Sequence, residues 1–361
     1  FVVRRFAPYL PLLLMVPLGN QSIAEALRVA SLRLLRPIWV AFLVLVSSNI
    51  LLYYTLHTQN YSYICSMKRI FIVAVLAAMA FCCGCSSEKN DNDIVAMSFN
   101  IRLSLSDDFD GENSWILRRE AVIEMINDVN PDIFGIQEGL LGQVKYMEDH
   151  LPGYGFYGVA RNDGPNTGES NAVFYKKSRF ELLESTTFWL SETPDEVSMG
   201  WDAAFHRIVT MVRLLDNNSG QELYFYNTHF DHIGKVAREE SGKLIVERMK
   251  SLIPADAAVV LTGDFNAGHN DPILDPIEDY MTSARRAAPV TDSLNTFNGW
   301  GKIAPEVGGK IIDHIYFRNM APLLFKTLTG AYSGVEYISD HYPVIAIFAL
   351  KDAQIREAQH E

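Results

Sequence analysis

The sequence feature that most constrains the fold is an apolar segment, residues 257–261, that runs into the polar sequence Thr262-Gly263-Asp264-Phe265-Asn266. A continuous apolar run of this length predicts a β-strand buried on both faces of its sheet. We expect Gly263 to end the strand and let the backbone turn, so that Asp264 and Asn266 face one cavity. Ligands of α/β sheets bind at such strand ends. The same residues are also compatible with an Asx turn that merely closes the strand.

Four other segments repeat this design, in which an apolar strand is followed by an acidic residue, Asn or His. Together the strand ends carry Asn100, Glu138, His229, Asp264, Asn266, Asp313, Asp340 and His341. Carboxylate and amide oxygens without thiolates suit Mg²⁺ or Mn²⁺ better than Zn²⁺. Such an ion binds a phosphoryl oxygen and positions water, while a His paired with an Asp works as an acid or base. Taken singly, each residue also has a structural explanation, so the prediction depends on their convergence.

Strands and helices alternate along the chain from residue 93, which predicts an α/β fold. Apolar residues recur with helical spacing in 115–129, 140–150 and 236–253. Strands are expected at 93–100, 132–138, 206–214, 222–227, 257–261 and 345–350, and a hairpin at 154–160 and 171–175. Hairpins between the helical units favour mixed sheets over purely parallel ones. Residues 180–201 show no single pattern.

The acidic balance of the chain, a formal net charge of −12 over 361 residues, bears on its partners. Non-specific binding of a polyanion requires clustered Lys and Arg, so this charge argues against such binding. A phosphodiester substrate stays compatible with it, because bound divalent cations would invert the local field. All four cysteines lie before residue 86, so residues 86–361 can hold neither a disulfide framework nor a cysteine metal site or nucleophile.

A secretory signal peptide is predicted at residues 67–84. Met67-Lys68-Arg69 gives a basic start, residues 70–81 form a short apolar core, and Cys83-Gly84-Cys85 follows. This arrangement resembles a bacterial lipoprotein signal peptide, with Cys85 as the lipidated first residue of the mature protein. An ordinary membrane anchor helix is the alternative. We therefore expect the rest of the chain to be exported and lipid-anchored to the bacterial cell envelope.

The other boundaries follow from this signal. Because Met67 begins a complete signal of its own, residues 1–66 are interpreted as an upstream extension of doubtful status. Within them, residues 37–56 are apolar enough to span a bilayer, but a spanning helix directly before a signal peptide makes little topological sense. The expected parts after the signal are a tether at 85–93, one domain at 94–350 and a polar, frayed tail at 351–361.

Six short motifs occur in order across residues 94–350. They are Ser98-Phe99-Asn100, Gln137-Glu138, Asn227-Thr228-His229, Gly263-Asp264-Phe265-Asn266, Ile312-Asp313-His314-Ile315 and Ser339-Asp340-His341. In order and rough spacing they resemble the endonuclease/exonuclease/phosphatase superfamily. The resemblance implies a four-layer α/β sandwich, in which two mixed β-sheets are flanked by helices. It also implies hydrolysis of phosphoesters with Mg²⁺ or Mn²⁺.

The resemblance further implies a role for each strand-end residue. Glu138 would be the principal metal ligand, with Asn100 beside it and Asp340 near the metal. Asp264 would orient or deprotonate the attacking water, and Asn266 would hold the phosphate.

The histidines have the remaining implied roles. Asp313 would orient His341, which would act as general base or stabilise the phosphate. His229 would contact the phosphate or assist the leaving group. It stands where abasic-site DNA endonucleases usually carry a tyrosine, and the His form is more similar to the deoxyribonuclease, deadenylase, sphingomyelinase and inositol-phosphatase branches. Arg207 is a candidate second phosphate contact, with an edge-strand arginine as the alternative.

Three functions are expected, in decreasing order. The favoured one is hydrolysis of a phosphoester, a diester ahead of a monoester, by a monomer whose substrate the sequence does not identify. An extracellular nuclease acting on DNA or RNA is the alternative, although the chain shows no basic stripe with interleaved aromatic residues of the kind that nucleic-acid channels use. A catalytically inactive surface binding protein is the third, and the intact set Glu138, Asp264 and His341 argues against it.

Overall fold

The computed structural model describes residues 91–105, 111–162 and 167–350. The predicted upstream extension, signal peptide and polar tail lie outside these residues, as does the tether up to residue 90. Among the described residues, no helix combines the length and the apolar character needed to cross a membrane.

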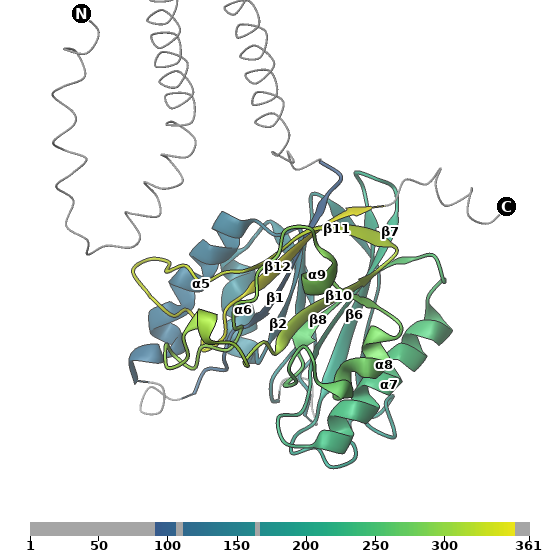
Figure 1. Ribbon diagram of the computed structural model, residues 1–361. Coiled ribbons are helices and arrows are strands. Elements are labelled where there is room, and N and C mark those ends of the chain that lie inside the picture. Colours follow the sequence, from purple (N-terminus) through teal and green to yellow (C-terminus); the bar gives the residue numbers. More distant parts are fainter. Residues whose placement is uncertain (1–90, 106–110, 163–166, 351–361) are drawn as a thin grey trace, which may run out of the picture. The chain divides into compact units, whose positions relative to one another are not determined.

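Two six-stranded β-sheets form the centre of the domain, and both are mixed (Figure 1). The first sheet has the order β11 (Met320–Thr327), β12 (Val344–Leu350), β1 (Ile94–Asn100), β2 (Ile133–Gln137), β4 (Val173–Lys176) and β3 (Tyr154–Tyr157). The second has the order β5 (Phe180–Trp189), β6 (Ile208–Asp216), β7 (Glu222–His229), β8 (Ala258–Asp264), β10 (Asp313–Arg318) and β9 (Thr282–Ser283). In each sheet one pair is parallel, β1 with β2 and β7 with β8, and the other pairs are antiparallel.

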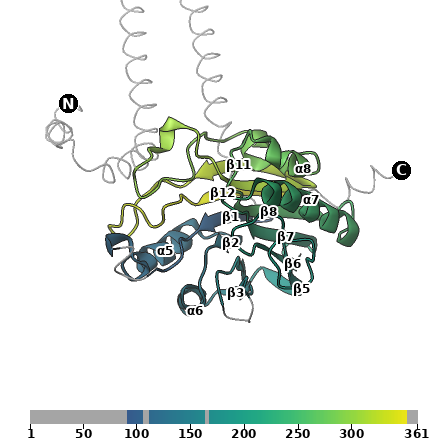
Figure 2. The same cartoon turned by 90° about the horizontal axis from the view of Figure 1, so that it is seen from below.

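Helices cover the outer face of each sheet, which confirms the predicted four-layer sandwich (Figure 1, Figure 2). The first sheet packs against α5 (Trp115–Val129) and α6 (Leu141–His150), and the second against α7 (Lys235–Leu252) and α8 (Asp275–Glu278). An apolar cluster fills each of the three interfaces between layers. The remaining short helices are η2 (Gly111–Asn113), η3 (Pro272–Leu274), α9 (Ala284–Ala287) and η4 (Pro305–Val307).

Each parallel pair of strands is joined through a helix, because parallel neighbours require a long crossover connection. α5 links β1 to β2, and α7 links β7 to β8. α5 ends where Asn130 takes a left-handed conformation, with φ 50°, and Pro131 follows it. The crossovers place the C-terminal ends of β1 and β2 at one edge of their sheet, and those of β7 and β8 at one edge of theirs.

The face of β8 that points toward the first sheet changes from apolar to polar along the strand. Ala258 and Val260 belong to the apolar cluster between the sheets. Thr262 and Asp264 continue the same face, because side chains alternate with a period of two, and they are buried as well. β7 repeats this change with Leu223, Phe225, Asn227 and His229. The polar edge of the sandwich is therefore a continuation of its core.

A buried hydrogen-bond network links the two sheets just below this polar edge. Asn227 Oδ1 accepts hydrogen bonds from Gln137 Nε2 at 2.7 Å and from Thr262 Oγ1 at 3.1 Å. Opposite Asn227 lies Gly135, where an added Cβ would be 2.3 Å from the Asn227 side chain. A larger residue at position 135 would thus separate the sheets. Buried hydrogen bonds between two sheets favour one packing arrangement.

Two long edge strands of the structure, β5 and β11, were not expected from the sequence, nor was the two-residue strand β9. β5 lies at the edge of the second sheet and is only partly buried, with Glu181 and Glu184 exposed on it, so it has no apolar run. β11 lies at the edge of the first sheet and is interrupted by a register shift between Pro322 and Leu324. Edge strands are half solvated, and for that reason their patterns are weak.

The expectation that Gly263 ends its strand is wrong. β8 continues through Asp264, and Gly263 pairs with Thr228 on β7 and with His314 on β10. Glycine is required there because a Cβ would lie 2.5 Å from the carbonyl oxygen of Thr228. The residue therefore allows close approach of two strands rather than a turn.

Candidate active site

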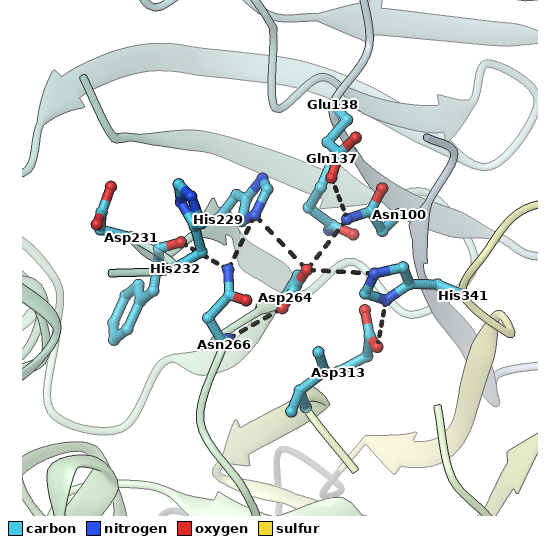
Figure 3. Close-up of polar contacts among 12 residues, drawn as sticks. Asn100, Gln137, Glu138, His229, Asp231, His232, Asp264, Asn266, Asp313 and His341 are labelled. Carbon is cyan, nitrogen blue, oxygen red and sulfur yellow. Dashed lines mark hydrogen bonds and ion pairs between the residues drawn. The ribbon is translucent and has the colours of Figure 1, made fainter. Parts of the chain in front are cut away.

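Three of the predicted residues form a row across the second sheet. His229, Asp264 and Asp313 are register partners on β7, β8 and β10, so their side chains emerge side by side on one face. Asp264 Oδ2 lies 3.5 Å from Nε2 of His229 (Figure 3).

The first sheet supplies the residues that face this row. Asn100 ends β1, Glu138 follows β2, and His341 lies in the segment before β12. Asn100 Nδ2 donates to Glu138 Oε1 at 2.9 Å and to Asp264 Oδ2 at 3.0 Å (Figure 3). One amide therefore connects a predicted metal ligand on one sheet with the predicted base on the other.

His341 forms a hydrogen-bonded dyad with Asp313. Its Nδ1 donates to Asp313 Oδ2 at 2.9 Å, and its Nε2 lies 3.7 Å from Asp264 Oδ2. Burial by itself lowers the pKa of His341, but the carboxylates of Asp313 and Asp264 outweigh it and raise this pKa to about 10. Burial and the neighbouring Asp313 raise the pKa of Asp264 above its ordinary value. The ring of His341 is therefore an imidazolium at neutral pH.

His229 is held in the opposite protonation state. Asn266 Nδ2 donates to the Phe230 carbonyl at 2.9 Å, which fixes the orientation of the amide, and lies 3.1 Å from His229 Nε2. The amide thus donates to Nε2, and the proton of the neutral ring sits on Nδ1. Burial, reinforced by the cations of Arg207 and Arg161, lowers the pKa of His229 well below its usual value.

The turn after β8 combines the two interpretations that the sequence left open. The backbone N–H of Asn266 donates to Asp264 Oδ1 at 2.9 Å, which is an Asx turn. The other carboxylate oxygen, Oδ2, faces Asn100 and the two histidines. Asn266 and Glu138 have positive φ angles, 47° and 63°. A left-handed conformation costs a non-glycine residue on the order of 1–3 kcal/mol, and such residues cluster at functional sites.

Asn100, Glu138 and Asp340 fit the hard cation that the sequence predicts. Glu138 and Asp340 line the same pocket, and burial together with the Glu138 carboxylate raises the pKa of Asp340. Glu138 Oε2 accepts one backbone hydrogen bond, from Leu103 at 3.0 Å. Asn100 Oδ1 accepts one from Arg102 at 3.0 Å and keeps a second lone pair. The buried carboxylate of Asp340, the half-buried carboxylate of Glu138 and an amide oxygen are an all-oxygen set, which suits Mg²⁺ or Mn²⁺.

A second group of ligand atoms, from Asp264, Asp313 and His341, also lies within 4.8 Å of one another. Here Nδ1 of His341 already donates to Asp313, and the imidazolium supplies the positive charge between the two carboxylates. We therefore interpret this group as an acid–base relay. The metal-ligand roles of Asn100, Glu138 and Asp340 stay predictions.

Glu138, His229, Asp264, Asn266, Asp340 and His341 line a pocket of about 430 Å³, whereas Asn100 and Asp313 are fully buried and do not line it. The lining residues that sequence reasoning missed include Arg161, Glu169, Phe205, His232 and Lys310. They lie outside the named strands, where no periodicity marks a functional position. For Arg161 and Glu169 the sequence offered one indication, which is that they flank the Gly- and Asn-rich segment 162–168.

Arg207 lies in this pocket and not on an edge strand. It directly precedes β6, which sits between β5 and β7, so the edge-strand alternative is wrong. Its Nε donates to Asp231 Oδ2 at 3.3 Å, and its Nη2 lies 3.3 Å from His232 Nδ1. The side chain is thus held rigidly at the pocket wall. Its contact with a phosphate stays a prediction.

A buried arginine on α5 ties together the two segments that carry the first sheet's functional residues. Arg118 is 1% exposed and donates to the carbonyls of Ile101 and Arg102, which follow Asn100, and to that of Ile338, which precedes Asp340. Sequence reasoning assigned it only to a charged helix face. The structure gives it a role in holding the loops of the site.

Comparison with known proteins agrees with this geometry. The model of the endonuclease/exonuclease/phosphatase family matches residues 97–341. A solved endonuclease/exonuclease/phosphatase from Bacteroides vulgatus is 35% identical, with a TM-score of 0.67, over 72% of this chain and 99% of that chain. The mannosyl-6-phosphatase of Bacteroides thetaiotaomicron is 34% identical, with a TM-score of 0.65, over 70% of this chain and 98% of that one.

A curated relative extends the similarity to a virus. An uncharacterized protein of Acanthamoeba polyphaga mimivirus is 26% identical over 277 residues, which cover 70% of this chain and 98% of that protein. The family match spans more than half of the chain and includes every strand end described above. The chain therefore belongs to the endonuclease/exonuclease/phosphatase family, whose members are hydrolases of phosphoester bonds.

Proposed function

We propose that the chain is a divalent-metal-dependent hydrolase in which water attacks the phosphorus of a phosphoester. The observation that carries this proposal is the meeting of both sheets' strand ends in one pocket, with Asp264 in contact with Asn100 and between two histidines. Mg²⁺ or Mn²⁺ held by Asn100, Glu138 and Asp340 would supply positive charge to a phosphoryl oxygen.

The chain's own residues carry the proton and position the phosphate. Asp264 Oδ2 accepts the proton of the attacking water, and its raised pKa suits a base that works near neutral pH. His341 donates from Nε2 to a phosphoryl oxygen and stabilises the charge that develops there. His229 Nδ1–H, which has no hydrogen-bond partner among the described residues, donates to a second oxygen of the substrate.

The substrate has two candidates. The sequence pattern favours a phosphodiester, and this stays a prediction. Similarity to the mannosyl-6-phosphatase, which is 34% identical over 70% of this chain, favours a sugar phosphomonoester. A pocket of about 430 Å³ is at the small end of the range for small-molecule sites, which supports a compact substrate in either case. The nuclease alternative is decided by the same experiment.

The test uses the purified chain with Mg²⁺, with Mn²⁺ or with excess EDTA. Substrates are p-nitrophenyl phosphate, bis-p-nitrophenyl phosphate, mannose 6-phosphate and plasmid DNA. We expect metal-dependent turnover that is lost in Asp264→Asn and kept in Asp256→Asn, an exposed aspartate before the same strand. Full activity in EDTA would overturn the proposal. No turnover, with ligand binding unchanged in Glu138→Ala, would identify a binding protein.

We also propose export and lipid anchoring through Cys85, supported by the sequence of residues 67–85. The test is expression of the full chain in a bacterium with a clickable palmitate analogue. Cys85→Ala should abolish labelling and Cys83→Ala should preserve it. An unlabelled chain that stays in the cytoplasm contradicts this proposal.

A further inference from the structure

One wall of the pocket carries two buried arginines that the metal and the acid–base residues do not use. Arg161 and Arg207 are 8% and 4% exposed, and both line the pocket. They gather positive charge at one place in a chain whose net charge is −12. Burying two guanidinium groups is costly unless they are paired and fully hydrogen-bonded.

Each arginine is fixed on one side by a carboxylate. Arg161 Nη2 donates to Glu169 Oε1 at 2.7 Å, and Arg207 Nε donates to Asp231 Oδ2 at 3.3 Å. Burial opposes ionisation of Asp231, but the backbone N–H groups of Gly234 and Ile233 lower its pKa to about 2, so it stays charged. These partners orient the guanidinium planes.

The pairing is incomplete on the other side. Arg161 Nε and Arg207 Nη1 are buried and have no hydrogen-bond partner among the described residues. A buried donor without an acceptor carries its full desolvation penalty. Arg161 and Arg207 thus keep unused hydrogen-bonding capacity in residues that line one pocket. Guanidinium groups bind phosphate oxygens with charge-assisted hydrogen bonds.

The arginine pair adjoins the predicted position of the reacting phosphate. Glu169, which holds Arg161, has its Oε2 3.9 Å from His229 Nδ1. Asp231 and His232, which contact Arg207, lie beyond His229 on the side away from His341 (Figure 3). A phosphate bound at His229 would therefore meet the arginines on one side.

The ring of Phe205 lies close to both guanidinium groups. Its centroid is 5.1 Å from Cζ of Arg161 and 6.0 Å from Cζ of Arg207, and the ring stacks on His232 at 5.6 Å. The side chain is 49% exposed. An aromatic ring at this place limits the approach of bulky groups to the arginines, while a small terminal phosphate reaches both.

We propose that Arg161 and Arg207 select a terminal, doubly charged phosphate, so that the enzyme hydrolyses phosphomonoesters in preference to diesters. A phosphomonoester carries about −1.5 to −2 charge at pH 7 and three acceptor oxygens, whereas each added ester group removes a charge and an acceptor. In the reaction, water forms a P–O bond, the ester P–O bond breaks, and the alcohol leaves with a proton together with inorganic phosphate. This inference rests on the proposed phosphoester hydrolysis.

The test compares two substrates that release the same alcohol, p-nitrophenyl phosphate and bis-p-nitrophenyl phosphate. The native chain should have the higher kcat/KM on the monoester. Arg161→Gln and Arg207→Gln should each lower kcat/KM on the monoester about 10- to 100-fold, and on the diester less than about threefold, as expected for loss of a charge-assisted hydrogen bond. The matched control is Arg248→Gln, which breaks an exposed pair with Asp195 outside this pocket.

A binding measurement distinguishes loss of the anion site from unfolding of a variant. Inorganic phosphate, the product, should inhibit the native chain competitively and bind about tenfold more weakly to each arginine variant. Arg207→Lys keeps the positive charge but lacks the planar fork of N–H donors, so its loss of phosphate affinity should be intermediate. Thermal melting checks that each variant folds.

The outcomes separate the two proposals. Equal losses on both substrates, or a native preference for the diester, overturn the selectivity inference and leave hydrolysis intact. Absence of metal-dependent turnover on either ester overturns the proposed function. In that case calorimetry with inorganic phosphate decides on the anion site, because binding that is unchanged in Arg207→Gln overturns it and binding that is lost supports it.

Discussion

Two histidines flank Asp264 at nearly the same distance and are held in opposite charge states. Nε2 lies 3.5 Å from Asp264 Oδ2 in His229 and 3.7 Å in His341. Both rings are buried. Carboxylates surround His341 and raise its pKa to about 10, whereas Arg207 and Arg161 join burial in lowering the pKa of His229.

The difference teaches that neighbours from other parts of the chain decide the protonation state of a motif histidine. His341 acts as a cation because Asp313, on another strand, accepts from its Nδ1. Burial and the cations of Arg207 and Arg161 lower the pKa of His229 and favour its neutral form, and the Asn266 amide, which donates to Nε2, leaves the ring proton on Nδ1. A third histidine, His314, shows the effect of burial with no carboxylate in hydrogen-bond contact, and its pKa falls to about 4. The pKa is thus lowered in two of the three rings and raised only where carboxylates contact the ring.

The largest expected effect comes from removing the group that both histidines share. Asp264→Asn takes away the proton acceptor and leaves the two rings without a common partner. We expect kcat/KM to fall about 10³- to 10⁴-fold, the upper part of the range for loss of a general base. Steady-state kinetics on the preferred ester measures this loss, with Asp256→Asn as control. A loss below tenfold would show that another group takes the proton.

The next largest effect is expected when His341 loses its carboxylate partner and so resembles His229. Asp313→Asn removes the carboxylate that holds the imidazolium, so we expect kcat to fall about 10²- to 10³-fold with little change in KM. Asp313→Glu keeps the negative charge and should recover part of kcat. If both variants lose the same amount, the carboxylate acts only through packing.

The smallest expected effect is on stability and concerns His314, the third histidine of the comparison. Its Nε2 donates to the Ala267 carbonyl at 2.9 Å. Burial lowers its pKa from 6.5 to about 4, so the unfolded chain binds a proton first on acidification. The stability associated with this neutral ring is present above pH 6.5 and is lost as the pH falls toward 4. At about 1.4 kcal/mol for each pH unit, the loss is on the order of 3 kcal/mol.

Urea unfolding of the native chain and of His314→Gln at pH 7.5 and pH 4.5 measures this loss. The free energy of unfolding of the native chain should fall relative to that of the variant at the lower pH. A difference between the two proteins that is the same at both pH values would contradict the prediction.

The sequence predicted the parts of the structure that repeat a simple physical rule. Strands buried on both faces are apolar runs, and the residue types at their ends, such as Asn100 and Asp264, are unusual enough there to be noticed. The same reasoning failed for β5 and β11, because an edge strand faces solvent and loses the apolar run.

The remaining residues of the site could not be predicted from sequence patterns, for a different reason. Arg161 and Glu169 lie between strands, where only the three-dimensional path of the chain brings them to His229. Arg118 looks like any charged residue on a helix, and only its contacts with three separate backbone carbonyls identify it as a support of the site. Spacing along the chain carries no information about such contacts.

The strand order of the first sheet also governs how the protein can be made. β1 is synthesised first among its strands, yet its neighbour β12 is the last strand of the domain, so one edge of β1 stays unpaired until residues 344–350 have emerged. An unpaired apolar edge invites pairing with other chains. His341 arrives on the same late segment. We therefore expect chains that end before residue 344 to leave this edge of β1 exposed and to aggregate more readily than the full domain.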